Sequence, residues 1–546
     1  MSIEGHDVGD RYQDLCDRFQ WDVPTTLNLG WWCADRHPAT ALAMVELGPD
    51  GTRREHTFGE LSTTSSRLAA GLAELGVDIG DRVAILLPQR FETGVAHLAA
   101  YKLGAMAVPL SILFGPEALG HRLQDAEPAV VITDGDHAEL ALACLEDVPA
   151  TVVVVDGPAA APLRRFDDLV ASGRADAASV QTGPETPALV IYTSGTTGRP
   201  KGAQHGHRVL LGHLPGFELS HDGFPQPGDR FWTPADWAWI GGLMDALMPS
   251  WYHGVCVVSS RRDGPFDPQW AARVIADEQV RNCFLPPTAL KQLRDAEVHL
   301  PGRLRSAMSG GEALGAEMLQ WAAEHLGVHV NEIYGQTEAN YLVGNSSINW
   351  PIRPGSMGRP YPGHHVAVLD DDGAPLPADV LGEIALRLPD PVAFLGYWHC
   401  PEETAAKVRD GWVHTGDSGR VAEDGYLFFA GRLDDVINSA GYRIGPTEIE
   451  DCLIGHPAVV MAAVIGVPDP VRGEAVKAFI QLREGVEATS ELERAIQEHV
   501  RTRLAAYEYP RQIEFVTELP MTTTGKVQRK ELRRIEKQQK DASASC

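Results

Sequence analysis

One stretch decides which fold classes remain open to this chain: Tyr192-Thr193-Ser194-Gly195-Thr196-Thr197-Gly198-Arg199-Pro200-Lys201-Gly202. It follows an apolar run, Pro187-Ala188-Leu189-Val190-Ile191, that predicts a strand. Its glycines let main-chain N–H groups approach anionic oxygens closely, while the hydroxyl groups and the Lys201 ammonium add donors. The stretch therefore predicts a triphosphate-binding loop after a strand. A surface turn rich in Gly, Ser and Thr is the alternative for such a loop seen alone.

The stretch does not match the Walker loop, G-x-x-x-x-G-K-[ST]. Lys201 follows Pro200 rather than a glycine, and Gly202 stands where that loop needs a hydroxyl residue to bind magnesium. The commonest kinase or ATPase interpretation therefore loses its main support.

Length and composition predict a multidomain globular protein. With 546 residues, 44% hydrophobic and 22% charged, the chain is longer than one hydrophobic core usually spans. No run approaches about 18 apolar residues, and the N-terminal segment is acidic and polar, so we expect a soluble, unexported, cytoplasmic protein without membrane insertion. The net charge of -27 disfavours nucleic acid as a partner. Eight cysteines without a C-x-x-C pair disfavour a disulfide framework and a zinc site.

The pattern of apolar runs predicts an α/β fold. Helical patterns alternate with apolar strands from residue 60 onward, which is typical of parallel-rich sheets with helices on their faces. Strands are expected at Arg82–Pro88, Ala129–Thr133, Thr151–Val155 and Val255–Val258. After about residue 360, His365–Leu369 and Gly382–Leu388 flank an Asp-Asp-Asp-Gly turn at 370–373. This arrangement predicts a hairpin in a small barrel-like subdomain.

A domain boundary is expected near Gly431-Arg432-Leu433-Asp434-Asp435. Residues 1–433 would form the N-terminal domain, and residues 434–546 a small α+β C-terminal domain. The expected elements of the second domain are a helix at Pro446–Leu453, strands at Val459–Ile465 and Val476–Leu482, and a helix at Leu492–Leu504. The polar tail from Lys537 to Cys546 is expected to fray.

Seven motifs occur in one order along the chain. They are the loop at 192–202, Ser309-Gly310-Gly311-Glu312-Ala313, Tyr334-Gly335-Gln336-Thr337-Glu338, Trp412-Val413-His414-Thr415-Gly416-Asp417, Gly431-Arg432-Leu433-Asp434-Asp435, Gly441-Tyr442-Arg443 and Thr524-Gly525-Lys526. From about residue 30 to 535 the chain thereby resembles the adenylate-forming superfamily, in particular short- and medium-chain AMP-forming acyl-CoA synthetases. The resemblance implies a ligase that uses ATP, Mg²⁺ and coenzyme A, and a C-terminal domain that is mobile.

The resemblance implies a role for each motif at the nucleotide. The β and γ phosphates would be held by Thr193, Ser194, Gly195, Thr196, Thr197, Gly198 and Lys201. The rest of the ATP site would comprise Gly311, Glu312, Ala313 and Glu332 at the adenine, Thr337 at the α-phosphate, Asp417 with Arg432 at the ribose, and Tyr334 and Gln336 as further nucleotide-binding residues. Glu338 would bind Mg²⁺, for which a carboxylate oxygen is the expected ligand. Taken alone, Thr337-Glu338 would predict a helix N-cap with its first-turn acid, and Arg432 a surface ion pair.

The resemblance implies that the catalytic residues are Lys526, Thr337 and Glu338. Lys526 would reach both the substrate carboxylate and the α-phosphate and stabilise the transition state of adenylation. The C-terminal domain would then rotate about the hinge residue Asp434 and bring Gly441, Tyr442 and Arg443 to the thioester step. The basic C-terminal segment would serve the phosphates of coenzyme A. A protein lysine acetyltransferase would silence Lys526 by removing its charge, and a deacetylase would restore it.

Two stretches are implied to form the acyl pocket. In the first, Gly335 replaces a tryptophan that closes the pocket of acetyl-CoA synthetases, which implies room for a longer acid. The second stretch supplies Trp239, Ile240, Gly241 and Gly242. Ala339-Asn340-Tyr341 departs from the family pattern, and Trp237 or Tyr341 is large enough to close the space again. We therefore expect a short to medium aliphatic acid of about three to eight carbons.

Other functions stay open at this point. The enzyme could load the phosphopantetheine of a carrier protein, although no carrier domain follows in this sequence, or it could take an aryl or branched acid. A nucleotide-binding protein without activity is a further alternative, against which Lys526, Glu338 and Asp417 argue. A hydrolase lacks support because neither a G-x-S-x-G nor an H-E-x-x-H motif occurs. The preferred acid and the oligomeric state are not predicted.

Overall fold

The structure is a computed structural model that describes residues 10–157, 162–175, 179–193, 200–261, 264–439, 442–469, 473–504, 509–521 and 526–544. The chain divides into two compact units. The first comprises Met1–Ile352, Pro360–His365 and Arg387–Val413, and the second Arg353–Arg359, Val366–Leu386 and His414–Cys546. The domain boundary expected between residues 433 and 434 stays a prediction.

The first unit contains an eight-stranded sheet with the order β19-β9-β8-β4-β3-β5-β6-β7. Its strands are β3 (Arg82–Leu86), β4 (Met106–Pro109), β5 (Val130–Thr133), β6 (Thr151–Val154), β7 (Arg164–Arg165), β8 (Pro187–Thr193), β9 (Lys201–Gly206) and β19 (Gly396–Tyr397). Strands β3 to β6 pair in parallel and are almost completely buried, as their runs of Val, Ile and Ala predict. The expected strands in this region are confirmed.

Helices cover this sheet. They are α2 (Phe58–Glu74), α3 (Phe91–Leu103), α4 (Pro116–Ala126), α5 (Ala138–Leu145), α6 (Phe166–Ser172) and α13 (Pro401–Lys407). Helix α2 begins where Thr57 Oγ1 accepts a hydrogen bond from Glu60 N, and α3 ends at Gly104 in the left-handed conformation. Leu119 and Leu123 of α4 pack with Val131 of β5 in one apolar core.

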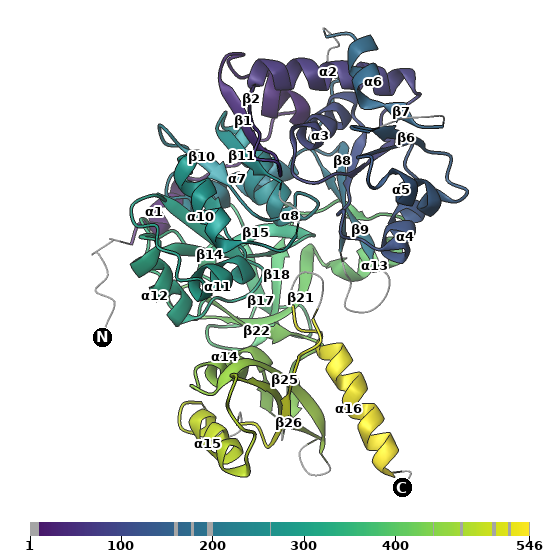
Figure 1. Ribbon diagram of the computed structural model, residues 1–546. Helices are drawn as coiled ribbons and strands as arrows, with labels where there is room; N and C mark the ends of the chain where they lie inside the picture. The colour runs from purple at the N-terminus through teal and green to yellow at the C-terminus, as the bar shows by residue number, and fades with distance from the viewer. Residues whose placement is uncertain are drawn as a thin grey trace. The chain divides into compact units, whose positions relative to one another are not determined.

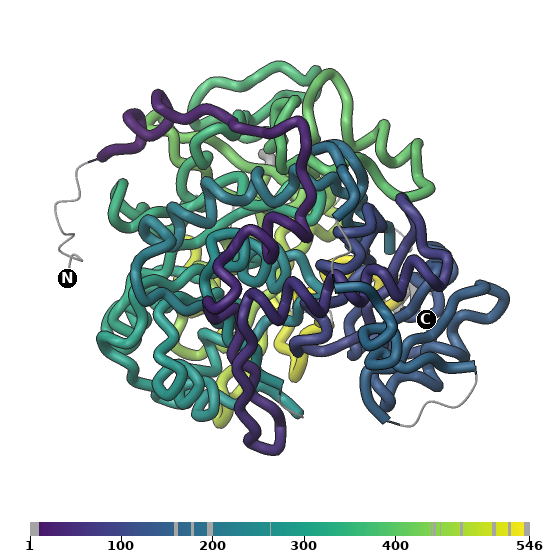
Figure 2. The backbone as a smooth tube through the Cα atoms, turned by 90° about the horizontal axis from the view of Figure 1, so that it is seen from above, coloured from purple at the N-terminus to yellow at the C-terminus, as the bar shows by residue number. Residues whose placement is uncertain are grey.

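A nine-stranded sheet forms the other half of the first unit. Its order is β16-β15-β14-β13-β12-β10-β11-β1-β2. Its strands are β1 (Leu42–Leu47), β2 (Arg53–Thr57), β10 (Arg230–Trp232), β11 (Cys256–Ser260), β12 (Asn282–Phe284), β13 (Ser306–Gly310), β14 (Val330–Gln336), β15 (Ala339–Gly344) and β16 (Arg359–Pro360). Figures 1 and 2 both show its teal segments beside the blue segments of the eight-stranded sheet.

Helices also pack on the nine-stranded sheet. They are α10 (Pro268–Asp277), α11 (Pro287–Asp295) and α12 (Ala316–His325). Strands of the same sheet are also contacted by α7 (Val209–Ser220), the π-helix η2 (Leu243–Leu247), which follows α8 (Ile240–Gly242), and α9 (Met248–Tyr252). Near the N-terminus lie α1 (Tyr12–Arg18) and the π-helix η1 (Trp31–Asp35). Val274 of α10, Leu290 of α11 and Ala322 of α12 join the buried core of strands β11 to β13. In the described part of the chain, no helix is both long and apolar enough to cross a membrane.

The second unit begins with antiparallel strands. Strand β17 (Val366–Leu369) pairs with β18 (Gly382–Arg387), and β21 (Trp412–Val421) pairs with β22 (Leu427–Arg432). Trp412 and Val413, the first residues of β21, belong to the first unit and pair there with the short β20 (Val408–Arg409). Gly373 N donates to Asp370 O over 3.1 Å in the turn that leaves β17. The predicted hairpin is therefore confirmed.

The C-terminal part of the second unit has a sheet of its own. Its order is β24-β23-β26-β25, and β27 pairs with β26. The elements are β23 (Ile437–Ser439), β24 (Tyr442–Ile444), α14 (Pro446–Ile454), β25 (Val459–Asp469), β26 (Gly473–Leu482), α15 (Ser490–Arg501), β27 (Gln512–Val516) and α16 (Arg529–Ala544). Helix α16 continues to Ala544, and the expected fraying of the polar tail from Lys537 to Cys546 stays a prediction. Buried Leu532 and the hydrogen bond from Lys477 Nζ to Glu536 hold this helix against the sheet.

One glycine sets a close contact of α7. A Cβ at Gly212 would lie 2.4 Å from the backbone N of Val392, and main-chain atoms cannot move aside as a flexible side chain can. We therefore expect Gly212→Ala to lower the free energy of unfolding by about 1 to 3 kcal/mol, measured from the midpoint of urea unfolding.

The matched control is Gly115→Ala. Gly115 has a φ of -69°, and among the described residues no atom lies within 4 Å of a Cβ placed there. This variant should change the unfolding free energy by no more than about 0.5 kcal/mol. Equal effects of the two substitutions would contradict the close packing of α7 on the segment around Val392.

Candidate functional site

The predicted phosphate loop lies between two antiparallel strands. Strand β8 ends at Thr193 and β9 begins at Lys201, and these two residues are direct cross-strand partners. The sequence predicted β8 but not β9. Ser194, Gly195, Thr196, Thr197 and Gly198 lie outside the described residues, so their contact with phosphate stays a prediction.

Thr337 and Glu338 form the turn of the β14–β15 hairpin. Gln336 and Ala339, on either side of them, are cross-strand partners. The helix N-cap that the Thr-Glu pair would suggest by itself is therefore wrong. The reason is the run from Ala339 to Gly344, which is buried throughout and continues the sheet instead of starting a helix.

Glu338 is nearly buried, and its carboxylate accepts a hydrogen bond from an uncharged donor. The residue is 8% exposed, and the hydroxyl of Tyr397 donates to its Oε1. Its backbone O accepts a hydrogen bond from Phe394 N over 2.8 Å. Next to it, Lys407 Nζ donates to Gln336 Oε1 over 3.0 Å. The carboxylate is thus held in place by the segment around Tyr397.

The same segment contacts the predicted phosphate loop. Strand β19 pairs with β9, with Tyr397 opposite Ala203. The Lys201 ammonium lies 5.4 Å from the centre of the Tyr397 ring and 3.7 Å from Glu403 Oε1. Tyr397 therefore lies between the predicted phosphate clamp and the predicted metal ligand. Sequence analysis missed it, because 59 residues separate it from Glu338 and no periodicity reveals such a contact.

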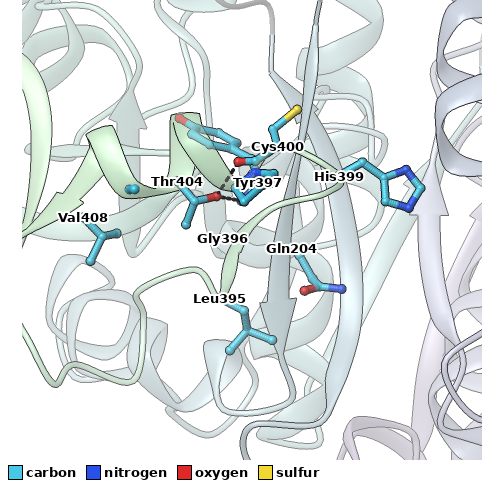
Figure 3. Close-up of a pocket in the computed structure, with 10 residues that line it drawn as sticks. Gln204, Leu395, Gly396, Tyr397, His399, Cys400, Thr404 and Val408 are labelled. Atoms are coloured by element: carbon cyan, nitrogen blue, oxygen red, sulfur yellow. Dashed lines mark hydrogen bonds between the residues drawn. The ribbon is translucent and has the colours of Figure 1, made fainter.

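A cavity of about 510 Å³ lies beside Tyr397. Figure 3 shows Thr404 at its wall, where Thr404 Oγ1 accepts from Tyr397 N and donates to Cys400 O, each over 2.8 Å. Burial, with the nearby carboxylates of Glu403 and Asp125, raises the pKa of the Cys400 thiol. Cys400 is therefore a thiol and not a nucleophilic thiolate at neutral pH.

The predicted adenine residues come together at the end of β13. Ser309 and Glu332 are cross-strand partners, and Glu332 Oε1 accepts a hydrogen bond from Leu314 N over 2.9 Å. The turn that contains Gly311, Glu312 and Ala313 is thereby fixed beside Glu332. Gly311 has a φ of +99°, which favours glycine. Contact with adenine stays a prediction.

Close backbone contacts explain two glycines of the predicted acyl pocket. A Cβ at Gly242 would lie 2.2 Å from Asp236 O, and one at Gly335 would lie 2.6 Å from the Cα of Asn340. The space beside Gly335, which the sequence led us to expect open, is taken by its partner strand. Trp239, Ile240 and Gly241 are partly exposed. Their contact with an acyl group stays a prediction.

The predicted ribose residues of the second unit form an ion pair. Asp417 on β21 and Arg432 on β22 are cross-strand partners, with Arg432 Nη1 2.9 Å from Asp417 Oδ1. The Asp417 side chain is 5% exposed and that of Arg432 32%. Oδ1 of the predicted hinge residue Asp434 lies 3.7 Å from Arg432 Nε. These geometries leave the roles of all three as predictions.

Lys526 is exposed and directly precedes Val527, which forms an isolated bridge with Met521. The strand β24 contains Tyr442 and Arg443, whereas Gly441 lies outside the described residues. Their roles stay predictions.

The basic segment near Lys526 is partly used inside the second unit. Arg529 Nε donates to Glu450 Oε1 over 3.0 Å, and Arg533 Nη2 donates to Asp435 Oδ1 over 2.6 Å. These arginines would have to break ion pairs with largely buried carboxylates before they could meet coenzyme A phosphates.

A magnesium ion at Glu338 fits the donors present. Among the described residues, no group of three or more His, Cys, Asp or Glu side chains could hold a metal ion. Mg²⁺ commonly binds through one or two carboxylates and completes its shell with water and substrate phosphates. A single buried carboxylate beside a predicted phosphate loop is therefore a suitable ligand set for a nucleotide-bound Mg²⁺.

Comparison with known proteins covers nearly the whole chain. The family model described as "AMP-binding enzyme" matches residues 30–398, and "AMP-binding enzyme C-terminal domain" matches residues 448–526. The chain is 36% identical to acyl-coenzyme A synthetase ACSM4, mitochondrial, of Rattus norvegicus, over 88% of this chain and 84% of that protein. It is 33% identical to acetyl-coenzyme A synthetase of Bacillus subtilis (strain 168), over 97% and 96%. The solved structure of anthranilate CoA ligase AuaEII with anthranoyl-AMP has a TM-score of 0.85 and 31% identity, over 96% and 99%.

Tyr397→Phe tests whether the phenol positions Glu338. The substitution keeps the ring beside Lys201 and removes the donor to the carboxylate. We expect about tenfold weaker Mg²⁺-dependent nucleotide binding in isothermal titration calorimetry, with nucleotide binding in EDTA unchanged.

The matched control is Tyr12→Phe, which removes a phenolic hydrogen bond to Pro360 O of 2.8 Å elsewhere in the first unit. It should leave both binding constants unchanged. An equal loss with and without Mg²⁺ in Tyr397→Phe would mean that the phenol only supports the fold.

Proposed function

Because the chain belongs to the AMP-binding enzyme family, we propose that it is an AMP-forming acyl-CoA synthetase, an acid–thiol ligase. It activates a short to medium-chain carboxylic acid with ATP and then transfers the acyl group to the thiol of coenzyme A. The observation that carries the proposal is the family match at both ends of the chain, at 36% identity to an acyl-coenzyme A synthetase. Because one of the similar structures is an anthranilate CoA ligase, the acids tested below include an aryl acid.

In the first half-reaction, a carboxylate oxygen of the acid bonds to the α-phosphorus while the bond from phosphorus to the pyrophosphate oxygen breaks. Thr193 and Lys201 hold the β and γ phosphates together with the loop between them. Glu332 and the turn at Gly311 hold the adenine, and the Asp417 carboxylate accepts from the ribose hydroxyls. These roles are supported by the contacts between Glu332 and Leu314 and between Asp417 and Arg432.

Lys526 brings a positive charge to the substrate carboxylate and the α-phosphate. Its charge lowers their repulsion and stabilises the charge that develops on the phosphorus oxygens. Glu338 would hold Mg²⁺, and Tyr397 keeps that carboxylate in place. When bound, Mg²⁺ neutralises charge on the phosphates.

In the second half-reaction, the sulfur of coenzyme A bonds to the acyl carbon, and AMP leaves with the electrons of the acyl–oxygen bond. We assign Asp434 as the hinge of the change between half-reactions, and Gly441, Tyr442 and Arg443 to the thioester step. The exposure of Asp434, 47% for its side chain, is compatible with a hinge. We propose the cytoplasm as the compartment, and the similarity to a bacterial acetyl-coenzyme A synthetase supports this.

The proposed activity is tested by acyl-CoA formation. A panel of straight-chain acids, branched acids and benzoate is incubated with ATP, MgCl₂ and coenzyme A, and thioesters are measured by mass spectrometry. Free coenzyme A and a phosphopantetheinyl carrier protein are compared as acceptors. We expect ATP-dependent thioesters of coenzyme A with short to medium acids. The proposal fails if no acid yields a coenzyme A thioester.

Lys526→Ala should separate the two half-reactions. We expect at least about 100-fold slower adenylation, measured as acid-dependent pyrophosphate exchange, because one preorganised charge is lost at the transition state. Conversion of a supplied acyl-adenylate to the thioester should stay within about twofold of the unmodified enzyme. Lys530→Ala, which removes another exposed cation nearby, is the control. Equal loss of both half-reactions in Lys526→Ala contradicts this division of roles.

We also propose that Lys526 is the target of a protein lysine acetyltransferase and a deacetylase. Its exposure permits access, and acetylation would remove the charge on which adenylation depends. Acetyl-phosphate treatment followed by peptide mass spectrometry should find acetyl-Lys526, with adenylation lost in proportion to its occupancy. Full activity at full occupancy would refute the proposal.

A further inference from the structure

A buried polar pair joins two elements of the predicted acyl region. Asp245 lies in η2, a few residues after Gly241 and Gly242, and Asn340 lies in β15, directly after the Glu338 turn. Asn340 Nδ2 donates to Asp245 Oδ1 over 2.6 Å. The two residues are 3% and 5% exposed. The reaction steps above use neither residue.

Burial favours the uncharged forms of the titratable side chains in this group. It raises the pKa of Asp245 well above its usual range, which favours the protonated carboxylic acid. Burial also lowers the pKa of the neighbouring His213 to about 4. His213 Nδ1 donates to Val209 O over 2.7 Å, which leaves Nε2 as an acceptor 3.3 Å from Asn340 Nδ2. Both donor directions of the Asn340 amide are therefore used within this group.

Two oxygen atoms of the pair are left without a partner in the described part of the chain. Asn340 Oδ1 accepts no hydrogen bond from the described residues, and Asp245 Oδ2 makes no hydrogen bond with them. A polar side-chain atom without a protein partner usually meets water or a ligand, because leaving it without a hydrogen bond costs free energy. As the protonated acid, Asp245 offers a donor at Oδ2, while Asn340 Oδ1 offers an acceptor.

Both oxygens face a predicted acyl-pocket glycine. A Cβ at Gly241 would lie 3.7 Å from Asp245 Oδ2, and a Cβ at Gly335 would lie 2.7 Å from Asn340 Oδ1. Gly241 and Gly335 belong to different stretches of sequence, and both are partly exposed. The two stretches that the sequence assigned to the acyl group therefore converge on one donor and one acceptor.

We propose that Asp245 and Asn340 form a polar wall of the acyl pocket, and that the preferred acid carries an uncharged hydroxyl group that bonds to them. A hydroxyl both accepts and donates, so it satisfies the Asp245 donor and the Asn340 acceptor together. A plain alkyl chain would leave both oxygens unpaired, and a charged substituent would lose its hydration without an opposite charge. This inference rests on the proposed function and narrows its substrate class from plain aliphatic acids to hydroxy acids.

The first test compares acids of equal chain length on the unmodified enzyme. Butanoate is compared with 2-, 3- and 4-hydroxybutanoate, and pentanoate with its 2- to 5-hydroxy derivatives, through kcat/KM for coenzyme A thioester formation. We expect one hydroxyl position in at least one series to exceed the plain acid by about tenfold or more, because a site built for a hydroxyl rejects the analogue without it. The inference is overturned if, in both series, the plain acid has a higher kcat/KM than every one of its hydroxy derivatives.

The second test removes the polar wall. Asp245→Leu should lower kcat/KM for the preferred hydroxy acid by about tenfold or more and leave the plain acid unchanged or improved. Asp245→Asn keeps a donor of similar shape and should retain the preference for the hydroxy acid. The control, Asp390→Asn, alters a carboxylate that is also buried, 2.7 Å from His364 Nδ1, and should leave the ratio of the two acids unchanged.

The outcomes separate this inference from the proposed function. If no acid forms a thioester, the proposed function fails, and the inference falls with it. If thioesters form but plain acids are preferred throughout, only the inference fails. A ratio that is the same in Asp245→Leu and the unmodified enzyme also overturns it. If Asp245→Leu does not fold by circular dichroism, the comparison of equal-length acids on the unmodified enzyme decides.

Discussion

The backbone of residues Phe394–Trp398 links the two sheets of the first unit, and the candidate site depends on this constraint. Through β19 the segment pairs with β9, the strand that leaves the predicted phosphate loop. Through Phe394 N it binds Glu338 O, in a hairpin turn of the nine-stranded sheet. The hydroxyl of Tyr397 adds a bond to the Glu338 carboxylate. A short segment thus fixes the phosphate-loop strand and the predicted metal ligand with respect to each other, which is the preorganisation that phosphoryl chemistry requires.

Most of the fold was predictable because its central strands are long apolar runs. Strands β3 to β6 are almost fully buried, and this shows directly in their Val and Ile content. Strand β9 was missed because its sequence, Lys201 to Gly206, is polar and rich in glycine, and only its pairing with β8 makes it a strand. The packing of α16 was not predicted for a similar reason, since Glu536 is polar in sequence but is buried through its contact with Lys477.

The candidate site was predictable only where a motif carries the information. Asp417 and Arg432 were paired from motifs, and they are cross-strand partners. Asp245 and Asn340 carry no such signal, because 95 residues separate them and their contact exists only once η2 meets β15. A glycine motif can also mislead. Gly335 suggested open space in the acyl pocket, but the partner strand β15 occupies that space. Sequence identifies which chemistry is present, while packing decides which atoms are left for the substrate.

The central claim is transfer of AMP to a carboxylate, and an oxygen label tests it most directly. The preferred acid, with ¹⁸O in both carboxylate oxygens, is converted to its coenzyme A thioester, and the nucleotide product is analysed by mass spectrometry. The account predicts AMP that carries one ¹⁸O for each thioester formed, because the oxygen that attacks the α-phosphorus stays with it. Unlabelled AMP, or ADP with the label in inorganic phosphate, would contradict it.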